Sequence, residues 1–298
     1  MDRLNDMRLF LDAASLGSFS AAGRKHGLSP AASSACIQRL EATLKIRLFE
    51  RTTRQLRLTD EGQIYRAYSQ QVLDLLIEAE HALQAGRTEV QGVVRISAPS
   101  DLGRNVLLTA LDAFSAQYPE VRFVLSLTDS TANLVGDDID LAVRYGQPAD
   151  SSMVARQLLP SQRVVCASPD RVAQTGVPKT PADLQGLPAL VLVTGAGPMN
   201  EWRYRENGQS ASVRVEGVRH SNDGEVIRKW ALQGYGYAWK SRPDITADLA
   251  AGRLVTVLDE YFTDQAPLNL LYHANRLQPL RLKLLIEFLM AQFAGHTI

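Results

Sequence analysis

The chain has 298 residues and no net formal charge, with 32 basic and 32 acidic side chains. This length exceeds one ordinary domain, so we expect two or three separate cores. The start MDRLNDMRLF lacks the apolar run of a signal peptide, and no stretch approaches the roughly 18 apolar residues of a membrane span. We therefore expect a cytoplasmic protein without membrane contact. Two cysteines, Cys36 and Cys166, are too few for a disulfide framework or a zinc site; buried thiols are expected, with redox sensing as the alternative.

Charge is distributed unevenly along the chain. Between residues 24 and 57, eight basic side chains accompany only Glu41 and Glu50, which gives this segment a charge of +6. Residues 58–90 carry −4. The neutral total therefore conceals a basic N-terminal head, which suits a polyanionic partner at one end of the molecule and a different task at the other.

The head carries the pattern of two short helices joined by a tight turn. Ser18 is placed to cap the first helix, and Gly27 is placed to end it in a left-handed conformation. Ser29 caps the second helix, with Pro30 at its first position, where a missing N–H costs nothing. This arrangement lays its second helix in the major groove of DNA. The alternative, a helical hairpin buried in a core, would need no positive charge.

One face of the second helix is expected to pack and the other to read DNA. Ile37 and Leu40 can pack on an apolar stripe of an earlier helix, formed by Leu4, Met7, Phe10, Leu11 and Ala14. The outward positions are then Pro30, Ala31, Ser34, Ala35 and Gln38. None of these is arginine or lysine, so the commonest strong base contact is absent. What remains is contact of Ala31 or Pro30 with a thymine methyl, the hydroxyl of Ser34 on a base or a phosphate, and the amide of Gln38 on adenine, so we expect specificity to rest heavily on duplex shape. The alternative is that the small residues only permit close approach to the DNA backbone.

A two-stranded wing is predicted after the second helix. Leu48-Phe49 and Leu56-Arg57-Leu58 flank the turn Thr52-Thr53-Arg54. Arg51 and Arg54 are expected to contact phosphates or the minor groove, and so to supply affinity more than sequence choice. The alternative for Arg51 is a surface ion pair with Glu50.

A long helix is predicted from Asp60, with Thr59 as its cap. Its apolar residues form a seam that a solitary surface helix cannot bury: Ile64, Tyr68, Val72, Leu75, Ala79 and Ala82 or Leu83. We expect a second copy of the chain to cover this seam in a homodimer or homotetramer. The alternative is packing on the protein's own C-terminal part, which the break at Gln91-Gly92 disfavours.

From Val93 onward, short apolar runs alternate with helical segments, which predicts an α/β fold. The runs are Val93–Ala98, Arg122–Leu127, Asp140–Val143, Arg163–Ala167, Leu190–Val193 and Gly236–Trp239. Ligands of such sheets bind beyond the carboxyl ends of strands, beside helix N-termini. Ser100 and the segment Ser221-Asn222-Asp223 occupy two such positions, and helix capping is the alternative for each.

The sequence shows no set of residues arranged for catalysis. None of the five histidines lies in an HExxH, nucleophile-elbow or paired-carboxylate setting. The turn Gly195-Ala196-Gly197 lacks the third glycine and the lysine of a phosphate loop. We therefore expect neither an enzyme nor a metal site. A secreted solute-binding protein would fit the C-terminal part but not the basic head.

Several segments together resemble the LysR-type transcriptional regulators along the whole chain. They are GSFSAAGRKHGLS, IQRLEATLKIRLFERTTRQLRLTDEG, LDAFSAQYPEV, DIDLAVRYG, ASPDRVAQTGVPKTPADL and AAGRLVTVL. DSSMVARQL, WALQGYGYAWKS and VTVLDEYF resemble one large and functionally diverse subset of that family.

The resemblance implies an α/β protein overall, with a winged helix-turn-helix at 1–59, a linker and dimerisation helix at 60–90, and an effector-binding domain at 91–298. That domain resembles a periplasmic binding protein, with lobe I at 92–163 plus 267–298 and lobe II at 164–266. Crossing strands are expected near Gln162-Arg163-Val164 and Ala266-Pro267-Leu268.

The resemblance also implies a small-molecule inducer in the cleft between the lobes, without a cofactor. Carried over by position, the effector-binding residues are Ser100, Thr128, Tyr145, Thr194, Ser221 and Asn222. An organic acid is the expected effector class. Double-stranded DNA is the expected partner, with RNA polymerase as a further candidate. Trp239 stands where many relatives have leucine, so a narrower or more aromatic cleft is expected.

Overall fold

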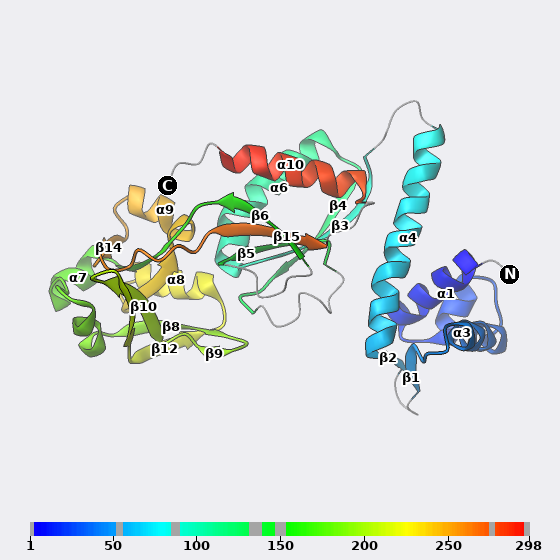
Figure 1. The fold of residues 1–298 in the computed structure, drawn as a ribbon, viewed down its shortest axis with the longest axis horizontal. Coiled ribbons are helices and arrows are strands. Elements are labelled where there is room, and N and C mark those ends of the chain that lie inside the picture. Colours follow the sequence, from blue (N-terminus) through cyan, green and yellow to red (C-terminus); the bar gives the residue numbers. More distant parts are fainter. Residues whose placement is uncertain are drawn as a thin grey trace. The chain divides into compact units, whose positions relative to one another are not determined.

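The computed structural model describes residues 3–51, 56–84, 90–130, 139–146, 153–273 and 278–294. The chain forms two compact units, Met1–Glu89 and Val90–Ile298 (Figure 1). Among the described residues, no helix is both long and apolar enough to cross a membrane.

The first unit is a helix-turn-helix followed by a two-stranded antiparallel wing and a long helix (Figure 1). Its elements are α1 (Arg3–Leu16), α2 (Phe19–Lys25), α3 (Pro30–Leu44), β1 (Phe49–Arg51), β2 (Leu56–Leu58) and α4 (Asp60–Gln84). The predicted caps are confirmed, because the Ser18 hydroxyl accepts a 3.2 Å hydrogen bond from the N–H of Ala21. Ser29 caps α3 in the same way through Ala32, also at 3.2 Å. Gly27 has a φ of +67°, which turns the chain between α2 and α3.

The core of the first unit lies between its first three helices and the wing. It contains Leu9, Phe10, Ala13, Ala22, Cys36, Ile37, Leu40, Leu48 and Phe49. Ile37 and Leu40 therefore pack inward as predicted. The predicted stripe on α1 is wrong in detail, because its fully buried residues are Leu9, Phe10 and Ala13. The other predicted members are only partly buried, since α1 contacts α2, α3 and α4 and so distributes its apolar side chains over several faces.

Gly62 allows α4 to start in close contact with the wing. A Cβ atom at this position would lie 2.0 Å from the carbonyl oxygen of Leu48. Thr59, the predicted cap, accepts a 2.9 Å hydrogen bond from the N–H of Gly62. The Thr59 hydroxyl also donates to the carbonyl of Arg47 at 2.8 Å. These contacts fix the first turn of α4 on the head.

The second unit contains two α/β lobes, each built on its own sheet (Figure 1). The sheet of lobe I has the strand order β4-β3-β5-β15-β6, with β3 parallel to both neighbours and β15 antiparallel to both of its own. Its strands are β3 (Gly92–Ala98), β4 (Val121–Leu127), β5 (Leu141–Tyr145), β6 (Met153–Leu159) and β15 (Leu268–His273). Its helices are α5 (Ser100–Leu102), the π-helical turn η1 (Gly103–Leu107), α6 (Leu108–Gln117) and α10 (Leu280–Ala294).

The sheet of lobe II has the order β12-β8-β13-β7-β14, with β9 paired to β8, and a separate hairpin joins β10 to β11. The strands are β7 (Arg163–Ala167), β8 (Ala189–Thr194), β9 (Gly197–Pro198), β10 (Glu201–Glu206), β11 (Gln209–Arg214), β12 (Gly217–Ser221), β13 (Tyr237–Ser241) and β14 (Val255–Val257). The helices are α7 (Pro169–Thr175), the 3-10 helix η2 (Pro181–Gly186), α8 (Gly224–Leu232) and α9 (Arg242–Ala250).

Two neighbouring segments carry the chain between the lobes. Gln162 and Gln265 form an isolated antiparallel bridge. The N–H of Ala266 donates to the carbonyl of Ser161 at 2.6 Å. This pair of crossings lies where β6 ends and β7 begins, and directly before β15 returns to lobe I.

All six strands expected from apolar runs are confirmed, as β3, β4, β5, β7, β8 and β13, with ends within two residues of those expected. The sequence analysis did not single out β6, β9, β10, β11, β12, β14 or the interior strand β15. Of these, β6, β12 and β14 are edge strands of the two large sheets, and β6 exposes Ala155, Arg156 and Gln157. An edge strand buries only part of its residues, so its apolar pattern is weak.

Candidate functional site

The outer face of α3 is open in the first unit. Pro30, Ala31 and Gln38 are exposed, and Ser34 is half-buried. The opposite face of the helix is fully buried through Ser33, Cys36, Ile37 and Leu40. The predicted DNA-reading positions therefore share one face, while their contacts with DNA stay a prediction.

Arg39 is a cation of α3 that the sequence analysis did not include in this face. It is exposed and lies one helical turn after Ala35, which is exposed too. Both residues line a groove against α1, together with His26 and Asp6. Its spacing of four from Ala35 is the pattern that would have identified it.

The wing has the predicted antiparallel form, but its basic tip is not described. Arg51 ends β1, and neither its side chain nor Arg54 lies within the described residues. Glu50 faces Arg57 across the strand pair. The phosphate contacts of Arg51 and Arg54, and the alternative ion pair with Glu50, stay predictions.

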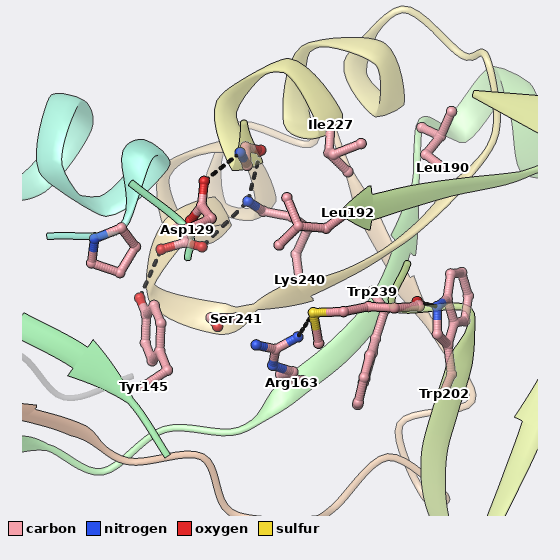
Figure 2. A pocket seen from close by; sticks show the side chains of 14 residues that line it. Asp129, Tyr145, Arg163, Leu190, Leu192, Trp202, Ile227, Trp239, Lys240 and Ser241 are labelled. Carbon is pink, nitrogen blue, oxygen red and sulfur yellow. Dashed lines mark hydrogen bonds and ion pairs between the residues drawn. The ribbon is translucent and has the colours of Figure 1, made fainter. Parts of the chain in front are cut away.

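A cavity of about 50 Å³ lies between the two lobes of the second unit (Figure 2). Lobe I contributes Asp129 and Tyr145 to its wall, and lobe II contributes Arg163, Trp239 and Lys240 among others. Polar side chains gather toward Asp129 and Lys240, whereas aromatic and aliphatic side chains form the rest of the wall (Figure 2).

Lys240, on β13, is the centre of the polar part. Its Nζ lies 2.5 Å from Asp101 Oδ2, 3.3 Å from Asp244 Oδ2 and 2.9 Å from the carbonyl oxygen of Gly224. These three acceptors match the three donors of an ammonium group. Burial disfavours its charge, but Asp244 and Asp101 outweigh this effect and raise the pKa of Lys240. Burial, supported by Asp244 and opposed by Lys240, raises the pKa of Asp101 to about 6.

Further hydrogen bonds close the lobes over this ammonium group. The N–H of Gly224, at the start of α8, donates to Ser100 Oγ at 2.7 Å and to Asp129 Oδ2 at 2.8 Å. Ser100 Oγ itself donates to Asp129 Oδ2. Tyr145 donates its hydroxyl to Asp244 at 2.7 Å, and burial together with Asp244 raises the pKa of Tyr145. The α8 N-terminus, expected to attract an anionic effector, thus already holds the carboxylate of Asp129.

The aromatic part of the wall surrounds Arg163, the first residue of β7. Its guanidinium carbon lies 4.8 Å from the centroid of the Trp239 ring. Trp239 in turn stacks on Trp202, with ring centroids 6.5 Å apart. Burial lowers the pKa of Arg163. Trp239 thus lies in the cavity wall, while the expectation of a cleft narrower or more aromatic than that of relatives stays a prediction.

The predicted effector-binding residues do not all reach this cavity. Tyr145 lines it, and Ser100 contacts two of its wall residues. Thr128 accepts a hydrogen bond from the N–H of Ser130, and Thr194 donates to the carbonyl of Gly197, so both serve local turns. 

The segment before α8 serves the helix itself. Asp223 caps α8 by accepting hydrogen bonds from the N–H groups of Glu225 and Val226. The Ser221 hydroxyl accepts one from the N–H of Asp223 at 3.1 Å, and Asn222 is exposed. A role for these residues in effector binding stays a prediction.

The sequence analysis missed the charged members of the cavity wall, because Asp129, Arg163 and Asp244 have no mutual spacing in the sequence that marks a shared site.

Both cysteines are buried and free, as expected for structural thiols. Burial raises the pKa of Cys166 to about 12. Burial and a hydrogen bond to Asp6 raise the pKa of Cys36. The reactive thiolate form is therefore disfavoured at both positions.

Two family models match the chain, one for each unit. Residues 4–63 match the bacterial regulatory helix-turn-helix protein, lysR family, and residues 87–294 match the LysR substrate binding domain. The chain is 34% identical over 295 residues to the HTH-type transcriptional regulator DmlR of Escherichia coli (strain K12), covering 98% of this chain and 95% of DmlR. 

Solved structures share the fold. CrgA, a LysR-type transcriptional regulator from Neisseria meningitidis, has a TM-score of 0.64 at 30% identity, covering 98% of this chain and 99% of that one. Full-length LysG from Corynebacterium glutamicum has a TM-score of 0.71 at 19% identity, covering 98% of each chain.

The helix-turn-helix and the two-lobed unit thus coincide with the two matched domains. The relatives are transcriptional regulators and not enzymes, which confirms the expectation of a non-catalytic protein. The chain belongs to the LysR family of DNA-binding transcriptional regulators, whose C-terminal domain binds a small-molecule effector.

Proposed function

We propose that this regulator reads its operator with the outer face of α3 and with the wing, as a homodimer or homotetramer joined through α4. The observation that carries this proposal is the exposure of Pro30, Ala31 and Gln38 on α3, inside the segment of charge +6. An exposed helix face within a basic segment of the chain suits a polyanionic duplex. Arg51 and Arg54 of the wing then add phosphate contacts.

The exposed seam on α4 supports self-association. Ile64, Tyr68 and Val72 are 60%, 63% and 41% exposed, although each is a large apolar side chain. They recur every four residues and thus share one face of the helix. A second copy of the chain that covers this face brings two heads onto one operator, as two-fold half-sites require.

The effector is proposed to bind in the cavity between the lobes. The bonds of Lys240 and Gly224 hold the lobes together around this cavity. A ligand that fits one arrangement of the lobes better than another shifts the equilibrium between them. This shift would alter how the paired heads contact DNA. A cytoplasmic location and contact with RNA polymerase are further parts of this proposal.

The proposed DNA-reading face of α3 is tested by measuring how full-length protein binds a labelled duplex. This duplex carries the DNA next to the gene that encodes the protein. The double substitution Ser34→Ala and Gln38→Ala should weaken binding to this duplex about tenfold and leave binding to a random duplex nearly unchanged. Thr43→Ala is the matched control, because Thr43 lies near the C-terminal end of α3 and its hydroxyl donates to the backbone carbonyl of Arg39. An equal loss on both duplexes would show that this face does not read bases.

A further inference from the structure

The cavity between the lobes has a donor-rich end that lacks an acceptor. Arg163 lines the cavity, and its hydrogen bond in the described ranges goes to the sulfur of Met199 at 3.8 Å. A thioether is a weak acceptor, and a guanidinium group carries five N–H donors. Figure 2 shows the Arg163 side chain beside the Trp239 ring. Most donors of Arg163 are therefore left without a strong acceptor in the part of the chain that the structure describes.

A second unsatisfied donor belongs to the same end. Trp239 Nε1 is buried and has no hydrogen-bond partner among the described residues. The other indole in this wall differs, because Trp202 Nε1 donates to the carbonyl oxygen of Met199 at 3.1 Å. Buried polar groups normally have partners, and a buried donor without one costs free energy. The buried N–H of Trp239 and the half-buried guanidinium of Arg163 line the same cavity, and together they point to an acceptor that arrives with the ligand.

The acceptor is a carboxylate for reasons of charge and shape. A guanidinium group binds a carboxylate through two parallel N–H···O bonds, and charge-assisted bonds of this kind are stronger than neutral ones. Burial lowers the pKa of Arg163 although Asp244 acts in the opposite direction, so a carboxylate bound beside the guanidinium would further offset the cost of keeping it ionised.

The rest of the cavity favours a single negative charge. Lys240, the other cation of the wall, already contacts Asp101, Asp244 and the carbonyl oxygen of Gly224. A second carboxylate on the ligand would face Asp129 and Asp244 at that end. Like charges in a poorly solvated site repel each other, so a dianion is disfavoured.

Size and apolar contacts limit the ligand further. The cavity volume of about 50 Å³ is roughly a third of the 150 Å³ that holds a benzene molecule in an engineered protein core. Leu190, Leu192 and Ile227 supply an aliphatic wall for a short hydrocarbon tail.

Arg163 also directly follows Gln162, which bridges to Gln265 where the chain crosses between the lobes. A ligand held there lies beside the segments that must move when the lobes change their arrangement.

We propose that Arg163 and Trp239 form the anchoring subsite for the carboxylate of a short-chain monocarboxylate, with its tail against Leu190, Leu192 and Ile227. This inference rests on the proposed role of the cavity as the effector site. It differs from an anchor at the α8 N-terminus, which Ser100 and Asp129 already occupy.

The test is calorimetric titration of full-length protein with acetate, propionate and butyrate, and with the corresponding amides, at constant ionic strength. At least one of the acids should bind, and its amide should bind about tenfold more weakly or not at all. Arg163→Met, which keeps an unbranched apolar stem but removes the charged guanidinium group, should weaken acid binding about tenfold or more. Trp239→Phe should weaken it by a smaller factor, because it removes only the N–H donor.

Arg219→Met is the matched control. Arg219 lies over the rings of Trp230 and Tyr235, at 5.4 Å and 3.5 Å, and is not part of the cavity wall. This variant removes the same charge from an aromatic contact of lobe II and should leave acid binding unchanged. If Arg163→Met does not fold, Arg163→Lys keeps the charge without the paired N–H geometry and should still weaken binding several-fold.

Three results would overturn the proposal: amides that bind as tightly as acids, an Arg163→Met variant with wild-type affinity, or no binding by any of the three acids. DNA retention, measured on the same samples, separates this inference from the proposed function. Acid binding through Arg163 without any change in DNA binding would refute the effector role of the cavity and leave the anchor intact. Amides that bind and alter DNA binding as acids do would refute the anchor alone.

Discussion

Lys240 Nζ lies 2.5 Å from Asp101 Oδ2, and this buried ion pair joins strand β13 of lobe II to helix α5 of lobe I. A buried pair costs desolvation of both ions, and it remains favourable only while each charge keeps its partner. Lys240 faces two aspartates, so the balance of charge around it depends on pH. The contact between the lobes should therefore respond both to mutation and to pH.

Replacing Lys240 with methionine should lower the free energy of unfolding of the second unit by about 3–5 kcal/mol at pH 8, because Asp101 and Asp244 lose their cation. With Lys240 present, the pKa of Asp101 is already about 6, and loss of the ammonium raises it further. The penalty should thus shrink from pH 8 to pH 5, as the carboxyl takes up a proton. Lys229→Met breaks an exposed pair with Glu225 and should cost less than about 1 kcal/mol at either pH. Denaturant titration measures both, and a pH-independent penalty for Lys240→Met would contradict the expectation.

Asp101→Asn isolates the titration of this one carboxyl group. Its folded-state pKa of about 6 lies above the unfolded value of 3.8, so the folded protein binds the proton more tightly. The stabilising contribution is fully present below pH 3.8 and is lost as the pH rises through about 6. The stability of the wild type relative to Asp101→Asn should therefore fall across this window. Thermal melts at several pH values test the sign, and a relative stability that rises with pH would mean a depressed pKa.

Gly62→Ala should destabilise the first unit by about 2 kcal/mol. The added Cβ would lie 2.0 Å from the carbonyl oxygen of Leu48, so α4 and the wing would have to separate. Gly186→Ala is the control, since no atom lies within 4 Å of the Cβ that it would add. Chemical denaturation of the two variants should show a loss for the first and almost none for the second. Equal losses of stability would show that the contact between residue 62 and the carbonyl oxygen of Leu48 does not cause the destabilisation.

The exposed seam of α4 predicts how the protein associates. The double substitution Tyr68→Lys and Val72→Lys places two charges on this face and should convert oligomers into monomers, because a charge cannot be buried in an apolar interface without a partner. Gln63→Lys adds a charge at an exposed position of α4 outside the seam and should leave the mass unchanged. Light scattering decides between these outcomes. Wild-type mass in the double variant would place the interface elsewhere.

Local sequence patterns predicted the helices and strands better than they predicted the residues of the cavity wall. Ser18, Ser29 and Thr59 cap the helices at which sequence placed them, because a cap depends only on residues three positions apart. The wall of the cavity combines Asp129, Arg163 and Lys240 from three separate segments. Arg163 and Lys240 lie on the paired strands β7 and β13 of lobe II, whereas Asp129 comes from lobe I. Their meeting depends on strand pairing and on how the two lobes close on each other, and no local spacing encodes either.

The hydrogen-bond partner of Ser100 also depends on how the two lobes close on each other. Ser100 was expected to cap its own helix or to bind a ligand, yet its hydroxyl accepts the N–H of Gly224 from the other lobe. A sequence pattern identifies Ser100 as a hydrogen-bonding residue beside a strand end. It cannot say which of two lobes supplies the partner.

The exposed face of α3 leads to a prediction about DNA sequence. Ala31 and Ala35 are exposed there, and the predicted reading positions contain no basic side chain. Small apolar residues can contact the methyl group of thymine, and duplex deformability must supply the remaining discrimination. We expect an A·T-rich half-site with few strongly fixed bases. Replacing a contacted thymine with uracil removes only the methyl group and should weaken binding.

Ala35→Arg should shift the preference of the protein toward guanine, because arginine donates two hydrogen bonds to the O6 and N7 atoms of that base. Arg39, one turn later, is the cation already exposed beside this position, so Arg39→Ala provides the comparison. If Arg39 contacts only phosphates, its loss should weaken specific and random duplexes alike and reduce the salt dependence by about one counterion. Selection of binding sites from a random pool measures the preference of each variant. A tightly fixed G·C-rich half-site for the wild type would rule out recognition through methyl contacts and shape, and would make Arg39 the first residue to test for base reading.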